Sequence, residues 1–123
     1  MGHGDALCGN ATTNGGTILT IPAGTSWKGT VTLSATVQIG SGGAAVMASA
    51  RVSIAGAGAM PPAGDYLRVD LQAPASILGA IGTGDSGSMM SDMFITAGAS
   101  PVTLVLNTTG TSSQSASANG RIL

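Results

Sequence analysis

Residues 27–39, WKGTVTLSATVQI, constrain the fold of this chain more than any other segment. From Val31 to Ile39, apolar and polar side chains alternate without a break. Because successive residues of a β-strand point to opposite faces of a sheet, this period of two predicts one buried and one exposed face. The chain's single Trp, Trp27, is in phase with the apolar set. We therefore expect a central strand of an all-β domain here.

The polar face of residues 30–38 is unusual because none of its side chains is charged. Only 7% of the chain's residues are charged, whereas about 25% is typical of globular domains. A free monomer ordinarily relies on surface charge for solubility, so we expect neighbouring molecules to cover much of this surface. The residues that form this candidate interface are Thr30, Thr32, Ser34, Thr36 and Gln38.

Short alternating or β-branched segments recur along the rest of the chain, each bounded by Gly, Pro, Asn or Ser. This pattern is typical of an antiparallel β-sandwich or jelly roll. We therefore predict a single all-β domain of about eight strands over residues 17–123. Besides residues 27–39, the predicted strands are 17–21, 44–54, 65–73, 89–96, 102–107 and 115–123.

Two further predictions concern the connections between strands. The Gly-rich residues 40–43 separate two long alternating segments, which favours a hairpin between residues 27–39 and 44–54. Residues 82–88 are rich in Gly and Ser and are expected to form a loop. Residues 76–81, SILGAI, fit either a short strand or a helical turn.

Residues 1–16 lack any hydrophobic period and contain several Gly and Asn residues. Such a segment is expected to be an extended arm that is disordered alone or ordered against a partner. An extended arm can add a strand to the sheet edge of a neighbouring molecule. The candidate partner-binding residues of this arm are Leu7, Cys8, Asn10 and Asn14.

Charge and aromatic content argue against nucleic acid and membranes as partners. The chain has four Lys and Arg residues, a net charge of −1, and one each of Trp, Tyr and Phe. A nucleic-acid site needs clustered cations and stacking aromatics, and a membrane-surface site needs clustered cations. We find neither a signal-peptide pattern nor an apolar stretch of about 18 residues. The single Cys cannot form an internal disulfide, which favours assembly inside a cell.

Residues 82–87, GTGDSG, match the sequence patterns of two known functional motifs, one for dinucleotide binding and one for catalysis. The G-x-G-x-x-G pattern binds dinucleotides only between a strand and a helix, and the surroundings here predict strands alone. The GDSG string resembles the nucleophile segment of chymotrypsin-like proteases, whose Ser needs a His as general base. The only His is His3, in the predicted arm. We therefore interpret the segment as a polar surface turn.

Metal-binding and acid–base residues are equally sparse. His3, Asp5 and Cys8 are close in sequence, but zinc sites need three or four ligands held in place. Calcium needs six or more oxygen ligands, and hydrolysis of glycosides needs two carboxylates facing each other across a cleft. We expect no enzymatic activity and no cofactor. The acidic residues that remain for such sites are Asp65, Asp70, Asp85 and Asp92.

Three Met residues, Met89, Met90 and Met93, cluster beside Phe94 and Ile95. Thioethers fill irregular gaps in cores and also line adaptable interfaces. The cluster therefore fits either core packing near an edge of the sandwich or an oligomer contact.

Two segments resemble small virion structural proteins of actinobacterial tailed phages. Residues 15–30, GGTILTIPAGTSWKGT, are similar to the opening of these proteins, and residues 102–123, VTLVLNTTGTSSQSASANGRIL, are similar to their end. The resemblance covers nearly the whole chain in order, and its motifs are structural rather than catalytic.

These phage proteins are similar to head-decoration, or capsid cement, proteins. The resemblance implies a non-enzymatic protein on the capsid exterior that is assembled in the host cytoplasm. It also implies binding to the major capsid protein and a homo-oligomer, with a trimer favoured. A phage tail or head-fibre component that contacts the host is the first alternative. A carbohydrate-binding sandwich is the second, and its stacking aromatics would come from Trp27, Tyr66 and Phe94.

Overall fold

The structure, a computed structural model, describes residues 2–40, 44–75 and 82–123, and this part of the chain contains strands and no helix. The predicted all-β sandwich is thereby confirmed. Residues 76–81, the predicted strand or helical turn, lie outside the described residues. The eight strands are β1 (Ala6–Ala11), β2 (Thr17–Ile21), β3 (Ser26–Gln38), β4 (Val46–Ala55), β5 (Gly64–Ala73), β6 (Thr83–Thr96), β7 (Val102–Thr109) and β8 (Thr111–Ile122).

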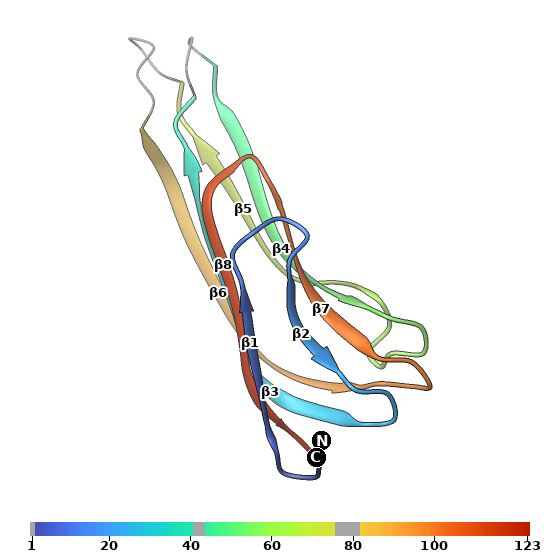
Figure 1. Cartoon of the computed structure of the whole chain (residues 1–123). Coiled ribbons are helices and arrows are strands. Elements are labelled where there is room, and N and C mark those ends of the chain that lie inside the picture. Colours follow the sequence, from blue (N-terminus) through green and yellow to red (C-terminus); the bar gives the residue numbers. More distant parts are fainter. Residues whose placement is uncertain (1, 41–43, 76–81) are drawn as a thin grey trace.

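The strands form two four-stranded antiparallel sheets, ordered β1-β8-β3-β6 and β2-β7-β4-β5. Early strands pair with late ones, β1 with β8, β2 with β7, β3 with β6 and β4 with β5. This pairing is that of a long hairpin folded over on itself, which is the connectivity of a jelly roll. The two chain ends lie side by side at the base of the molecule, and β3 to β6 extend beyond the other strands at the opposite end (Figure 1).

The core lies between the two sheets and is built from the inward side of each alternating strand. Val31, Leu33 and Val37 of β3 are fully buried, as the alternation predicts. Trp27 is also fully buried, at the base of the sandwich. Across the core, the buried side chains of the second sheet include those of Ala50, Val52 and Ile54 in β4, Leu67, Val69 and Leu71 in β5, and Leu104 and Leu106 in β7.

The predicted central position of β3 is confirmed, but its predicted hairpin with β4 is wrong. The two strands belong to different sheets and face each other across the core. The hydrogen-bonded neighbours of β3 are β6 and β8. Alternation reveals which face of a strand is buried, but it does not distinguish a partner beside the strand from one across the core.

The N-terminal segment does not form an arm outside the sandwich over Ala6–Ala11. These residues make β1, an edge strand that pairs with Ala116–Arg121 of β8. The pairing is supported by the side chain of Trp27, whose indole Nε1 donates a hydrogen bond to the carbonyl oxygen of Leu7 at 2.9 Å. Interactions with residues distant in the sequence thus order a segment that has little intrinsic strand signal.

The predicted loop at residues 82–88 is also wrong, because β6 begins at Thr83 and forms an edge of the first sheet. Its glycines allow close packing of the two sheets. A Cβ atom on Gly84 would lie 2.6 Å from Cβ of Ala73, and one on Gly87 would lie 2.8 Å from Cγ1 of Val69. Glycine is required here because β5 approaches the backbone of β6.

Candidate interaction face

The outer face of the β1-β8-β3-β6 sheet is the main candidate for a functional surface. Its polar side chains align in rows, because the strands pair in register. Ser34 lies opposite Ser88 on one side and Ser115 on the other. We call this surface the hydroxyl face and define it by Thr30, Thr32, Ser34 and Thr36 of β3, Ser86 and Ser88 of β6, and Ser113, Ser115 and Ser117 of β8.

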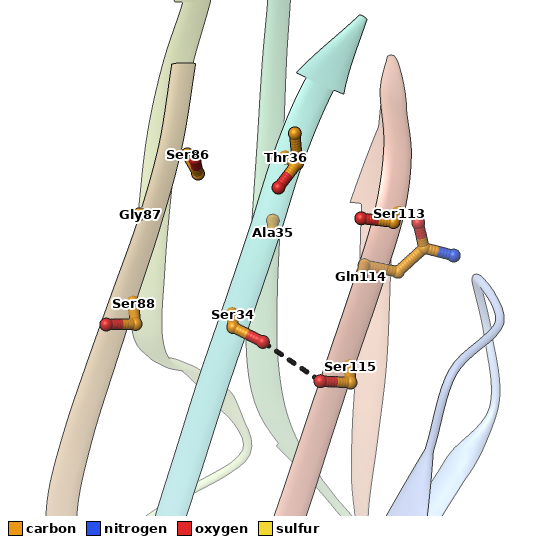
Figure 2. Close-up of a pocket in the computed structure, with 9 residues that line it drawn as sticks. All are labelled: Ser34, Ala35, Thr36, Ser86, Gly87, Ser88, Ser113, Gln114 and Ser115. Atoms are coloured by element: carbon orange, nitrogen blue, oxygen red, sulfur yellow. Dashed lines mark hydrogen bonds between the residues drawn. The ribbon is translucent and has the colours of Figure 1, made fainter. Parts of the chain in front are cut away.

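The hydroxyl face includes a shallow hollow of about 480 Å³ across three adjacent strands. Figure 2 shows that Ser34 and Thr36 lie between the serines of β6 and those of β8. The hydroxyls of Ser34 and Ser115 form a hydrogen bond of 2.9 Å. Since every Ser or Thr hydroxyl can both donate and accept, such a surface can bond to a partner backbone without burying an unpaired charge.

The sequence-predicted interface residues therefore lie together on one face. Thr30, Thr32, Ser34 and Thr36 are half-buried between neighbouring strands, and Gln38 is exposed at the far end of β3. Thr30 donates a hydrogen bond to Oδ1 of Asp92, at 2.8 Å. The Thr and Ser side chains offer uncharged hydroxyl groups that both donate and accept hydrogen bonds. They lie on a strand that is paired on both sides.

The four candidate arm residues make contacts within their own chain. Leu7 is half-buried and packs against the core. Cys8 is exposed, and its thiol donates to Oδ1 of Asn119 at 3.2 Å. Asn10 is exposed opposite Ser117. Oδ1 of Asn14 accepts a hydrogen bond from the backbone N–H of Thr108 at 2.9 Å.

Two cations lie at the base of the same outer face, where sequence reasoning did not place a site. Lys28 of β3 and Arg121 of β8 lie directly opposite each other in the pairing register. Both are exposed, and no ion pair joins either of them to another described residue. They line a second hollow, of about 660 Å³, together with Asn119 and the backbone of Gly29 and Gly120. Only the strand pairing could have located this pair.

The Met cluster is distributed between the surface and the core. Met90 and Phe94 are 70% and 54% exposed and point to the outer face, opposite Thr32 and Lys28. Met93 is partly buried against the core. The outward residues of β6 therefore add apolar surface beside the hydroxyl face and the cations.

The outer face of the second sheet has a different electrostatic character. Arg51 pairs with Asp65 at 3.4 Å, and Arg68 pairs with Asp70 at 2.8 Å. A hydrogen bond from Ser53 and the nearby Arg51 guanidinium lower the pKa of the Asp65 carboxyl. Both cations of this sheet are thus already neutralised within the chain.

The motif candidates for chemistry are not assembled into a site. Ser86 of the GDSG string is in an edge strand, and no described helix follows Gly87. Among the described residues, no three His, Cys, Asp or Glu side chains are grouped closely enough to hold a metal ion. Trp27 is fully buried and therefore cannot stack on a sugar ring.

No family model matches the chain, and neither a curated protein nor a solved structure shows detectable similarity to it. Within the part of the chain that the structure describes, no helix is long and apolar enough to span a membrane.

Proposed function

We propose that this chain is a non-enzymatic structural protein of a tailed-phage virion. Its proposed role is that of a capsid decoration protein, which binds the lattice of the major capsid protein and stabilises the head. The observation that supports this role most is the hydroxyl face, centred on Ser34, which forms a broad sheet surface of small polar side chains. A surface of this kind suits a flat protein partner more than a small substrate, because its hollow is shallow and lacks convergent charges.

The sequence resemblance to phage virion proteins supplies the biological setting of the proposal. A jelly roll with a core of buried aliphatic side chains is a suitable scaffold, since a cement protein must stay rigid while the head is under internal pressure. Most of the fully buried side chains are Ile, Leu and Val from both sheets. We also propose self-association on the capsid, with a trimer favoured, and the exposed Met90 and Phe94 support such contacts.

The test is binding to purified, expanded heads of the phage whose genome encodes the chain. The wild-type protein is expected to co-sediment with the heads and to raise the temperature at which they release DNA. Ser34→Arg, which places a bulky cation in the centre of the hydroxyl face, is expected to weaken binding at least tenfold. Failure of the wild-type protein to bind heads would contradict the proposal.

Ser49→Arg provides a matched control. Ser49 is also a half-buried, outward Ser on an interior strand, but it belongs to β4 in the second sheet. It should leave binding unchanged, and circular dichroism should show both variants folded. Equal binding by the two variants would rule out the hydroxyl face as the contact.

Localisation distinguishes the alternatives. Immunogold labelling of virions at the tail tip or at fibres, instead of over the head, would identify the chain as a tail or head-fibre component. Binding in a glycan array would instead favour the carbohydrate-binding function. The buried Trp27 leaves Phe94 and Tyr66 as the exposed aromatics for stacking, and the Tyr66 hydroxyl already donates to the carbonyl of Pro62.

A further inference from the structure

Lys28 and Arg121 carry two positive charges that form no ion pair with the described residues. They are directly opposed on adjacent strands, and like charges in this position repel each other. Asp92 lies one row further along β6 on the same face, and it accepts a hydrogen bond from Thr30. No ion pair connects either cation to a described carboxylate.

The second sheet provides an internal comparison. There, Arg51 and Arg68 each have an Asp partner within the chain. All four Lys and Arg residues therefore lie on outer sheet faces. Two of them pair with an Asp, and the two that share a hollow form no ion pair with any described residue. This difference in charge indicates that the base of the first sheet is complementary to an anionic group from outside the chain.

The hollow around the cations has space for such a group. Its floor is the backbone of Gly29 and Gly120, which lie opposite each other in the register. The exposed amide of Asn119 also lines it, and Phe94 is the cross-strand neighbour of Lys28 on the other side. Arg binds carboxylates through paired N–H groups, and buried Arg and aromatic residues dominate the energetics of protein interfaces.

We infer that Lys28 and Arg121 bind a carboxylate side chain of an acidic segment on the partner protein. The inference rests on the proposed function, because it takes the partner to be the protein lattice of the head. Two adjacent cations in one hollow fit a point-like anion. A nucleic acid requires a track of cations along its backbone, and the chain's net charge of −1 does not favour it.

The first experiment measures binding to heads by Arg121→Gln and Lys28→Gln. Each variant should lose at least tenfold in affinity, and the loss should shrink as salt concentration rises, since screening already weakens the wild-type contact. Arg68→Gln is the matched control, because it removes the same charge from the other outer face, and it should bind as the wild type does. If Arg121→Gln and Lys28→Gln bind as tightly as the wild type, the inference is overturned and the proposed function stands.

A second experiment does not depend on heads. The ¹⁵N amide spectrum of the protein is titrated with capped hexaglutamate peptide, with inorganic phosphate and with a dT12 oligonucleotide. The peptide should shift the amides of Lys28, Asn119 and Arg121 in the wild type and in Arg68→Gln, and not in Arg121→Gln. The absence of a peptide shift overturns the inference, as does a larger shift with phosphate or dT12. If heads do not bind the wild type but the peptide does, the proposed function fails and the acidic-segment site remains.

Discussion

The indole Nε1 of Trp27 donates a hydrogen bond to the carbonyl oxygen of Leu7, at 2.9 Å. The same ring packs where Gly29 and Gly120 have no side chains, since a Cβ atom on Gly120 would lie 2.6 Å from Cε2 of Trp27. One side chain of β3 thus contacts β8 and donates a hydrogen bond to β1, the edge strand beyond it. The indole adds to the backbone pairing of Ala6–Ala11 with β8, which places β1 in the sandwich.

Replacing Trp27 with Phe tests this attachment. The change removes the N–H donor, leaves the Leu7 carbonyl without its partner and opens space around the smaller ring. We expect a loss of about 1–3 kcal/mol in the free energy of unfolding, measured by urea denaturation. Amide exchange should accelerate more over Ala6–Ala11 than over β4. Unchanged exchange in β1 would show that other contacts hold this strand.

Deletion of residues 2–11 distinguishes an integral strand from a dispensable arm. The deletion exposes the edge of β8 and the indole of Trp27, both covered in the intact chain. We expect the free energy of unfolding to fall by more than about 2 kcal/mol, because burying one large apolar side chain contributes about 1.5–3 kcal/mol. A truncated chain with an unchanged urea midpoint would instead support the arm predicted from the sequence.

The sequence predicted those features of the fold that depend on local patterns. The alternation in residues 27–39 located an interior strand and its two faces, and the polar set Thr30 to Thr36 lies together as expected. In such a strand, apolar residues occupy buried positions and polar residues occupy exposed ones, so the sequence alone assigns each side chain to a face. The strand lengths and faces of β4 and β5 follow from the same rule.

The features that the sequence did not predict depend on residues far apart in the chain. Glycines in the N-terminal segment and in residues 82–87 indicate loops when considered locally. In the structure, Gly9 and Gly87 lie in strands where another strand approaches the backbone closely. Likewise, Lys28 and Arg121 become neighbours only through the pairing of β3 with β8. Polarity and local propensity contain no information about this register.

Gly120→Ala should be destabilising although it adds a single methyl group. The new Cβ atom would meet the Trp27 ring and the backbone of Lys28, and neither can move without disturbing β3. We expect a loss of about 1–3 kcal/mol or more in the free energy of unfolding, as for overpacked cores. Gly82→Ala is the control, because its Cβ would lie 3.4 Å from Cδ1 of Ile39, an ordinary contact. Equal urea midpoints for the two variants would contradict the packing described for Trp27.

Asp65 gives a prediction about pH. The Ser53 hydroxyl, followed by the Arg51 guanidinium, stabilises the ionised carboxyl and lowers its pKa below the ordinary value of 3.8. Because the folded pKa is the lower one, the contribution of this carboxylate to stability is complete above pH 3.8 and is lost as pH falls through the folded pKa. Ser53→Ala should therefore raise the Asp65 pKa toward 3.8 and flatten the dependence of stability on pH below this value. A ¹³C titration of the carboxyl measures the shift. Ser49→Ala, on the same strand, should leave the Asp65 pKa in place, and an equal pKa in both variants would show that Arg51 is the dominant influence.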